Sequence, residues 1–294
     1  MSTITRAVVV GLDRSDQGRA AVEYAAARAV RHHRPLRVVH AFEPSQYAVR
    51  ATIGWTPDMH DVLRNSAQRL VDETTEVLAM VYPDLELQTR LEPGSAVEML
   101  VEESEHADAV VVGSRGSGGF ADLIIGSTTL HVASQARCPV IAVPSPPDGE
   151  PPRHGVVVGV DGSAMSESAI EFALQVASDL DEPLVALHAW TDPARVGPGV
   201  MLPLVYDPTL VADEEGLVLA ESMAGWAEKY PDVRIENKVT RGHAVHALIT
   251  EARRARLLVV GSRGRGSVRS LLGSVSHGVL HHSTGPVAVV HQHD

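Results

Sequence analysis

The chain has 294 residues, 44% of them hydrophobic and 21% charged, and its formal net charge is −12 at pH 7. This length suits two domains, and the acidic excess disfavours binding to nucleic acid or to an anionic membrane surface. No run approaches the roughly 18 apolar residues of a membrane-spanning helix, and the N-terminus is typical of a strand rather than a signal peptide. One cysteine, Cys138, cannot form an internal disulfide, so we expect a cytoplasmic protein.

Short β-branched runs alternate with longer helical segments along the first half of the chain. The runs predict strands at 7–12, 36–41, 85–90, 109–113 and 139–143, and the longer segments predict helices at 16–32, 58–80, 95–106 and 122–136. Ser15 or Asp16 is suited to cap the first helix, and Ser95 the third. This alternation indicates an α/β fold, in which helices cover both faces of a parallel sheet.

The second half repeats the first. VVVGLD at 8–13 returns as VVVGVD at 156–161, 148 residues later, and the copied strands are predicted at 156–160, 184–189, 233–239, 257–261 and 286–290. Between the copies lies PSPPDGEPPRH at 144–154, whose five prolines prevent a continuous strand or helix. We therefore expect a first domain at 1–144, a linker at 145–154 and a second domain at 155–294.

Each copy carries a glycine-rich segment, at 113–127 and 261–274, that runs from a strand into a helix. Ligands of open α/β sheets bind at this edge, glycines permit close approach and positive φ, and N–H groups at a helix N-terminus favour anionic oxygens. The segments therefore suit phosphate, although glycines that only make a flexible turn would give the same pattern. Neither GxxxxGK[ST] nor GxGxxG after the first strand is present.

The first glycine segment resembles the ATP-binding signature of the universal stress protein family, G-2x-G-9x-G-[S/T], through Gly113, Gly116, Gly126 and Ser127. Both copies also share with that family the V-G-x-D end of the first strand and the C-P-V or G-P-V start of the last. The resemblance covers nearly the whole chain, as a tandem two-domain member of the actinobacterial type. It implies two Rossmann-like (adenine nucleotide alpha hydrolase-like) domains, each a five-stranded parallel sheet ordered 3-2-1-4-5 and flanked by helices.

The resemblance also implies one ATP site in each copy, with Mg²⁺ as a candidate companion ion. The aspartate after the first strand and the end of the second strand would hold the adenosine, and the glycine loop would hold the phosphates and ribose. Asp13 and Asp161 would repel a bare triphosphate, so a place beside the adenosine or facing a metal suits them. By position, the implied binding residues are Gly11, Asp13, Ala41, Val112, Gly113, Gly116, Gly126, Ser127 and Thr128 in the first copy, and Gly159, Asp161, Ala189, Val260, Gly261, Gly264, Gly273, Ser274 and Val275 in the second.

The second glycine segment departs from the family pattern by one residue. Nine residues separate Gly116 from Gly126, but only eight separate Gly264 from Gly273. A shorter loop changes closure entropy little, whereas N–H donors must lie about 3 Å from phosphate oxygens. We expect two competent sites, of which the second is perturbed.

Other chemistry-bearing residues show no catalytic or metal-binding pattern. The chain has fifteen histidines, none in an HExxH or Cys/His frame, so we expect no metal site from them. His40 and His188 follow buried strands and are expected in the core or behind the ligand site, and Cys138 is expected to be an inert thiol. Arg115, Arg263 and Arg265 either contact phosphate or are solvated, and loops 43–57 and 191–212 are either lids or surface connections.

These observations favour an ATP-binding regulatory module of the stress response, which acts through conformation or through an unidentified regulatory protein partner. No general base stands out, so we expect no catalytic residue and at most weak ATP hydrolysis. The alternatives are a slow ATPase or nucleotide-transfer enzyme on the same fold, and a nucleotide-free partner-binding module. The last strands, 139–143 and 286–290, should be sheet edges that need covering. The resemblance implies that they meet in an intramolecular pseudo-dimer, and two such chains could form a homodimer.

Overall fold

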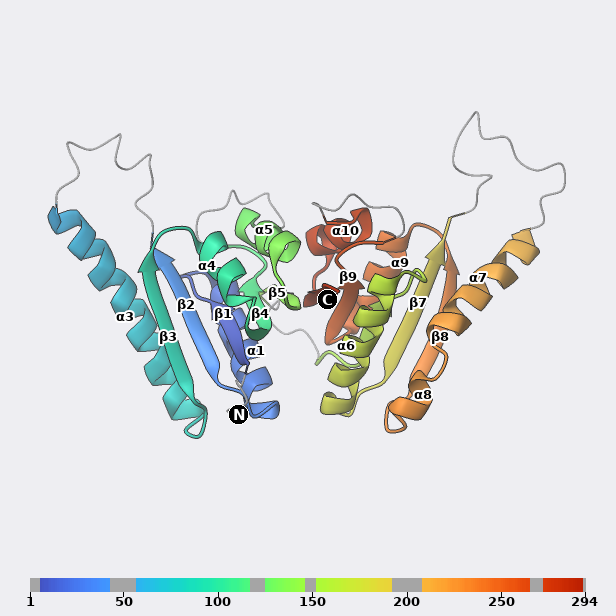
Figure 1. Ribbon diagram of the computed structural model, residues 1–294, viewed down its shortest axis with the longest axis horizontal. Coiled ribbons are helices and arrows are strands. Elements are labelled where there is room, and N and C mark those ends of the chain that lie inside the picture. The colour runs from blue at the N-terminus through green and yellow to red at the C-terminus, as the bar shows by residue number, and fades with distance from the viewer. Residues whose placement is uncertain are drawn as a thin grey trace, which may run out of the picture. The chain divides into compact units, whose positions relative to one another are not determined.

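The computed structural model divides the chain into two compact units, Met1–Ser145 and Pro146–Asp294. The structure describes residues 6–42, 57–116, 125–145, 152–191, 208–264 and 272–292. Each unit is a parallel sheet with its own helices (Figure 1).

The first unit alternates strand and helix as the sequence predicts. Its strands are β1 (Ala7–Gly11), β2 (Leu36–Phe42), β3 (Leu87–Pro93), β4 (Ala107–Gly113) and β5 (Val140–Val143), and its helices are α1 (Asp16–Arg31), α3 (Pro57–Val81), α4 (Ala96–Glu103) and α5 (Ser127–Gln135). Ser15 caps α1 by accepting the Gly18 N–H, and Ser95 caps α4 by accepting the Glu98 N–H. The predicted Ser95 cap is confirmed, and of the two candidates for α1 the cap is Ser15.

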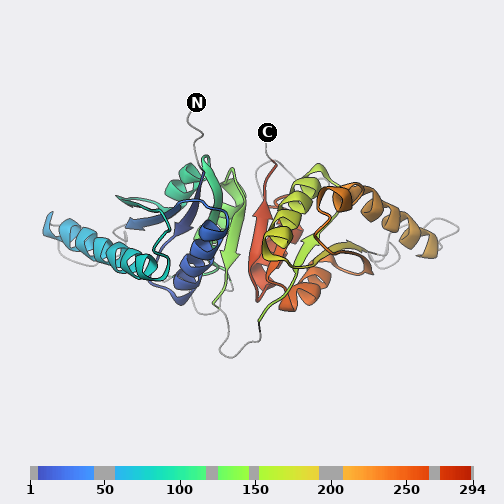
Figure 2. The same ribbon diagram turned by 90° about the horizontal axis from the view of Figure 1, so that it is seen from below.

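The strand order of the first unit is β3-β2-β1-β4-β5, and every neighbouring pair is parallel. Val8 of β1 lies opposite Leu36 of β2, and Val10 lies opposite Val111 of β4. Consecutive residues of β1 and β4 are buried, as both faces of the sheet are covered. Figure 2 shows α1 and α3 on one face of these strands and α4 on the other, as right-handed crossovers require. The predicted order 3-2-1-4-5 is confirmed.

The second unit repeats this order as β8-β7-β6-β9-β10. Its strands are β6 (Val156–Gly159), β7 (Leu184–Trp190), β8 (Ile235–Arg241), β9 (Leu257–Gly261) and β10 (Val287–Val290). Its helices are α6 (Ala164–Leu180), α7 (Pro208–Ser222), the short α8 (Trp226–Lys229), α9 (Ala244–Glu251), the 3₁₀ turn η2 (Ala252–Arg254) and α10 (Ser274–His282). The α/β class predicted for both halves is confirmed.

Some element boundaries differ from the prediction. The third strand of the first unit begins at Leu87 instead of 85, because a turn in which the Leu85 N–H bonds the Tyr82 carbonyl oxygen precedes the ladder. The helix predicted at 122–136 begins at Ser127 with Gly126 as its cap, and residues 122–124 lie outside the described part. The first glycine-rich segment therefore ends directly at the N-terminus of α5.

One outer helix differs between the two units. In the first, α3 is continuous from Pro57 to Val81. In the second, α7 ends at Ser222, and Gly225, with φ of 80°, turns the chain before α8 begins at Trp226. Glycine adopts this left-handed conformation without the steric cost that other residues meet. The counterpart of Gly225 in α3, 148 residues earlier, is Val77, which continues the helix.

Candidate functional site

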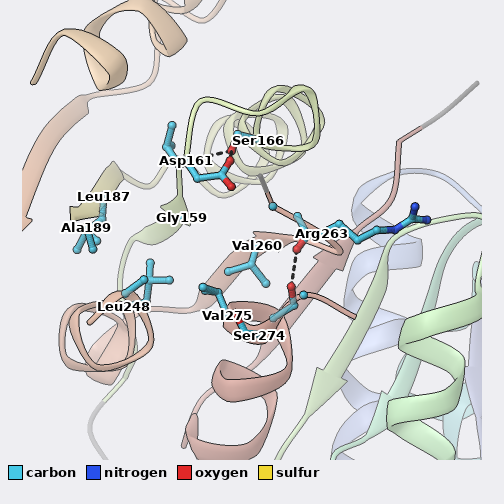
Figure 3. Close-up of a pocket in the computed structure, with 16 residues that line it drawn as sticks. Gly159, Asp161, Ser166, Leu187, Ala189, Leu248, Val260, Arg263, Ser274 and Val275 are labelled. Carbon is cyan, nitrogen blue, oxygen red and sulfur yellow. Dashed lines mark hydrogen bonds between the residues drawn. The ribbon is translucent and has the colours of Figure 1, made fainter. Parts of the chain in front are cut away.

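The candidate site of the second unit lies at the carboxyl ends of its central strands, where the strand order changes direction from β6 towards β7 on one side and β9 on the other. A cavity of about 360 Å³ opens there. Its lining includes all nine residues that the sequence assigns to this half: Gly159, Asp161, Ala189, Val260, Gly261, Gly264, Gly273, Ser274 and Val275. Segments that are more than 100 residues apart in the chain thus meet around one space (Figure 3).

The cavity has an apolar side that the sequence analysis identified only in part. Leu187, Ala189 and Leu248 lie together on it, with Val260 between them and the start of α10 (Figure 3). Leu248 and Ala244 come from α9, which carries no motif, so sequence reasoning missed them. The sequence feature connected with Leu248 is the glycine at position 159. A Cβ there would lie 3.1 Å from a Leu248 methyl group, so glycine leaves room for that side chain.

Asp161 is held by the turn that begins α6. Its Oδ1 accepts hydrogen bonds from the Ser163 N–H at 3.0 Å, the Ser163 hydroxyl at 2.6 Å and the Ser166 hydroxyl at 2.5 Å. Its other oxygen faces Gly264, where a Cβ would lie only 2.5 Å from Oδ2. The carboxylate is therefore fixed at the rim of the cavity, against the glycine loop.

This contact corrects the reason expected for the loop glycines. Among the described glycines, positive φ is found at Gly94, Gly155, Gly162, Gly225 and Gly242, and at none of the glycines assigned to the two sites. Gly264 and Gly116 instead leave room for the carboxylates of Asp161 and Asp13. The remaining glycines of the loops allow backbone segments to approach closely: a Cβ at Gly113 would lie 2.9 Å from the Gln17 backbone.

The polar side of the cavity is the N-terminus of α10. Gly273 caps this helix without a side-chain hydrogen bond, its own N–H bonds the Ser262 carbonyl oxygen at 2.8 Å, and the first turn contains no acidic residue. The next N–H groups have no partner within the helix, because an α-helix leaves its first donors unsatisfied. The Ser276 hydroxyl bonds the Gly261 carbonyl oxygen at 2.7 Å, which ties the helix to the end of β9. Such a terminus attracts anions.

The first unit builds the same framework from its own residues. Oδ1 of Asp13 accepts from the Ser15 N–H at 3.0 Å and the Ser15 hydroxyl at 2.5 Å. A Cβ at Gly116 would lie 3.0 Å from the Asp13 carboxylate, and one at Gly11 would lie 3.5 Å from the Val112 side chain. The structure therefore brings Gly11 to Val112 and Asp13 to Gly116.

The remaining assigned residues of the first unit lie on the same strand edge or at the helix that follows it. Gly126 caps α5, bonds the Ser114 carbonyl oxygen through its N–H at 2.7 Å and lies beside the Gly116 N–H. Gly113 ends β4 and Ala41 is near the end of β2, while Ser127 and Thr128 form the first turn of α5. Residues 117–124 and 265–271 lie outside the described part, so the expected effect of the shorter second loop stays a prediction.

Two differences separate the described parts of the sites. Ser166, which donates to Asp161, has Gly18 as its counterpart 148 residues earlier, and a Cβ at Gly18 would overlap Oδ1 of Asp13. Buried His188 lies 2.7 Å from the Val160 carbonyl oxygen through Nδ1 and 2.6 Å from Oε2 of Glu215 through Nε2. The matching Nδ1 of His40 lies 2.7 Å from the Leu12 carbonyl oxygen, but the counterpart of Glu215 is Ala67.

Cys138, Arg263 and His281 were weighed above as a reactive thiol, a phosphate contact and a metal ligand. Burial raises the pKa of Cys138 to about 12, so its thiol stays protonated at neutral pH. Arg263 lines the cavity, but Figure 3 shows its guanidinium directed away from it. Partial burial, together with His277 and His282, lowers the pKa of His281.

The described residues also bear on metal binding and on membrane crossing. No group of three or more His, Cys, Asp or Glu side chains comes together there in a way that could hold a metal ion. Among the helices that the structure describes, none combines the length and hydropathy that crossing a lipid bilayer requires.

Known proteins match both halves of the chain. Residues 5–144 and 153–291 each match the Universal stress protein family. A universal stress protein of Mycolicibacterium smegmatis is 35% identical over 295 residues, covering 96% of each chain, and one of Mycobacterium tuberculosis is 36% identical over 296 residues, covering 97% of each. The crystal structure of a universal stress protein from Archaeoglobus fulgidus shares the fold, with a TM-score of 0.67, 20% identity and coverage of 98% of this chain and 97% of that one.

Two matches to one family, together with relatives of similar length along nearly the entire sequence, agree with the duplicated α/β fold and its glycine loops. The chain belongs to the universal stress protein family, as a member with two tandem domains.

Proposed function

We propose that this chain is an ATP-binding regulatory module of the stress response, with one ATP site in each repeat. The observation that carries the proposal is the convergence of all nine assigned residues of the second repeat on one cavity at the sheet edge. At about 360 Å³ the cavity falls within the range of small-molecule sites. Its two sides differ in chemistry in the way that the two ends of a nucleotide do.

The apolar side suits the adenine base. Leu187, Ala189 and Leu248 supply aliphatic contact, and the backbones of neighbouring strand ends supply N–H and C=O groups that can read a base edge. The chain holds only 3 Phe, 5 Tyr and 3 Trp, so recognition by aliphatic packing rather than by stacking fits its composition.

The glycine side suits the phosphates. Ser274 and Val275 place the first N–H groups of α10, which have no partner within the helix, on the cavity beside Gly273. In the first repeat, Gly126, Ser127 and Thr128 have the corresponding positions on α5. No acidic residue stands in the first turn of either helix to oppose a phosphate.

Asp13 and Asp161 belong to the nucleoside end of the site. A carboxylate beside the triphosphate would oppose binding by charge repulsion, whereas one beside the ribose can accept hydrogen bonds from its hydroxyls. The alternative role is to face Mg²⁺ bound with the nucleotide, for which carboxylate oxygen is a suitable ligand. Either role requires the carboxylate to stay where Ser163 and Gly264 hold it.

Regulation rather than efficient catalysis follows from the groups that surround the cavity. Asp161 is the titratable carboxylate of its lining, and its Oδ1 already accepts three hydrogen bonds, so it is a poor general base. Slow ATP hydrolysis and nucleotide transfer remain the competing functions. We place the protein in the cytoplasm, where ATP is available, and expect its nucleotide state to be read by a protein partner.

Three measurements test the proposal. Mass spectrometry of the small molecules released when the purified protein is denatured should find an adenine nucleotide at up to two equivalents per chain. Incubation with labelled ATP should then give product far more slowly than one turnover per second, below typical enzyme rates. Recovery of no nucleotide, together with no heat of binding on titration with ATP, would leave the partner-binding module as the better function. Several turnovers per second would make the protein an enzyme.

We also propose that the last strands of the repeats associate, so that the chain forms an intramolecular pseudo-dimer. Strands β5 and β10 each end the strand order of their own repeat, and apolar strand edges are commonly paired or covered. Disulfide formation between cysteines introduced into β5 and β10 would support it. A crystal structure with these strands on opposite outer surfaces would contradict it, and size-exclusion chromatography with light scattering would report the homodimer.

A further inference from the structure

A second cavity in the second repeat lies between the start of α6 and the α7–α8 segment, and measures about 620 Å³. Gly162 and Glu167 line it on the α6 side, and Val218, Glu221, Trp226 and Lys229 line it from α7 and α8. Ser166 lies on the walls of both this cavity and the proposed nucleotide site, but the remaining lining differs. We refer to this cavity as the α6–α7 cleft.

The cleft depends on the interruption of the outer helix. Gly225 turns the chain with φ of 80°, which sets Trp226 at the start of α8 with its indole N–H bonded to the Ser222 carbonyl oxygen at 3.1 Å. In the first repeat the counterpart of Trp226 is Leu78, a buried residue of the continuous helix α3. The second repeat therefore has an aromatic wall at a position where the first has an aliphatic core contact.

The first repeat crosses the corresponding region with its own arginine. The Arg14 guanidinium donates through Nη2 to the Ser66 carbonyl oxygen at 3.0 Å and to the Ser66 hydroxyl at 2.9 Å, which joins the loop before α1 to α3. The counterpart of Arg14 is Gly162, which lines the cleft and has no side chain. The counterpart of Ser66 is Glu214, an exposed carboxylate one turn before Val218. A guanidinium is thus present in one repeat and replaced by open space in the other.

The α6–α7 cleft carries negative charge, which is complementary to a guanidinium group. Glu167 and Glu221 are exposed and have no ion pair or side-chain hydrogen bond within the described part of the chain. The counterpart of Glu167 is Arg19, so the charge at this position is reversed between repeats. Lys229 also lines the cleft, but its ammonium is paired with Glu171 at 2.5 Å and lies 4.8 Å from the Trp226 ring centroid. The two free carboxylates therefore set the local preference for a cation.

We propose that the α6–α7 cleft binds a guanidinium group, in the region where the first repeat places Arg14. A planar guanidinium donates to carboxylates in pairs, and its flat faces pack on apolar and aromatic side chains, which Val218 and Trp226 supply here. The group can come from a free arginine-like molecule or from an arginine side chain of a protein partner. Both have the same recognising chemistry, and the test separates them.

The test follows the Trp226 indole N–H in ¹H–¹⁵N spectra of the full chain, with the other two tryptophans as internal references. N-acetylarginine amide should shift the Trp226 signal saturably, and N-acetylcitrulline amide, which has nearly the same shape without the charge, should not. The variant E167Q/E221Q should weaken the arginine response by about fivefold, as expected for loss of two exposed charge contacts. E73Q, which alters the first-repeat counterpart of Glu221, is the matched control and should leave the response unchanged.

The source of the group is decided by a third probe, acetyl-Gly-Arg-Gly amide. Tighter binding of this peptide than of the arginine amide would indicate an arginine of a protein partner, and equal affinity would indicate a small molecule. The proposal is overturned by equal shifts with the citrulline derivative, by no saturable shift with either arginine probe, or by an unchanged response in E167Q/E221Q. The three substitutions in these two variants change exposed residues, so folded spectra are expected throughout.

Discussion

The two repeats hold their assigned ligand residues in the same framework but support them differently. In both, a serine two residues after the aspartate binds its Oδ1, and a glycine of the loop leaves room for the carboxylate. In the second repeat Ser166 adds a third donor to Asp161, and His188 is joined to Glu215 behind the site. In the first repeat those positions hold Gly18 and Ala67. A duplicated chain can thus keep its motif residues at the sheet edge while the residues behind them diverge.

The largest expected effect comes from filling the loop glycines. Gly116→Glu should abolish ATP binding in the first repeat, and Gly264→Glu in the second, because a side chain displaces the aspartate and its charge opposes phosphate. Since the second loop is shorter, we expect the second site to be the weaker one. Calorimetric titration of ATP into each variant should show the greater loss of total binding for Gly116→Glu.

Gly216→Glu is the matched control for this pair, since nothing lies within 4 Å of a Cβ there. It adds the same charge to α7 and should bind ATP as the wild type does. A greater loss from Gly264→Glu than from Gly116→Glu would reverse the ranking of the sites. A loss of only several-fold at either site would count against the assignment of the loop.

Exchanging the residue types of Ser166 and Gly18 tests how much they contribute to the difference between the two aspartate environments. Ser166→Gly removes the 2.5 Å hydrogen bond to Asp161 and the bond from the Asp161 N–H to the Ser166 oxygen, so ATP affinity at the second site should fall by about tenfold. Gly18→Ser should weaken the first site at least as much, because its Cβ overlaps the Asp13 carboxylate. Each affinity is measured in the background in which the other site carries its Gly→Glu change. An unchanged affinity in Ser166→Gly would show that Ser163 alone positions Asp161.

The His188–Glu215 contact should appear in stability rather than in binding. Glu215→Ala leaves buried Nε2 of His188 without its partner, and the free energy of unfolding of the second repeat should fall by about 1–3 kcal/mol. The neighbouring exposed residue Glu214 provides the control. Glu214→Ala should change the free energy of unfolding of the second repeat by less than about 0.5 kcal/mol. Urea unfolding monitored by hydrogen exchange of β7 amides measures both. Equal effects of the two changes would mean that the His188–Glu215 contact does not contribute to the stability of the second repeat.

The smallest expected effect concerns acid pH. Glu182 accepts the Gly155 N–H at 2.8 Å and pairs with Arg256 at 2.8 Å, and its counterpart in the first repeat is Arg34. Burial raises the pKa of Glu182, but the Gly155 and Arg256 contacts outweigh it, so the pKa lies below 4.5. Because the folded pKa is lowered, the stabilisation is complete above about pH 4.5 and is lost as pH falls through the lower folded value.

Glu182→Gln should therefore reduce the stability of the second repeat at pH 7 and flatten the dependence of that stability on pH below about 4.5, with little change in the first repeat. Thermal unfolding over this range, read through amides of each repeat, is the measurement. An equal slope in the variant and the wild type would assign acid sensitivity to other carboxylates.

Much of the fold could be predicted from the sequence because its signals are local and occur twice. Runs such as Val8–Val10 are buried on both faces of a parallel sheet, and the Ser15 and Ser95 caps start their helices. The boundaries were less accurate where a turn precedes the ladder, as before Leu87, because the first ladder bond depends on the neighbouring strand. The nine motif residues predicted for the second repeat all line its cavity, whereas Leu248 and Ala244, which lie on a helix without a motif, were not predicted.

By itself the sequence determined the duplication, the alternation of strand and helix, and the identity of the residues at the carboxyl edge of each sheet. Those features follow from periodicity and spacing, which act between residues close along the chain. Only the tertiary structure decided that Gly264 accommodates Asp161, that Ser166 and Gly18 make the two aspartate environments unequal, and that Gly162 and Gly225 leave a cleft where Arg14 bridges the first repeat. Each of these depends on which distant side chains meet, because packing and hydrogen bonding act through space between segments that the sequence separates.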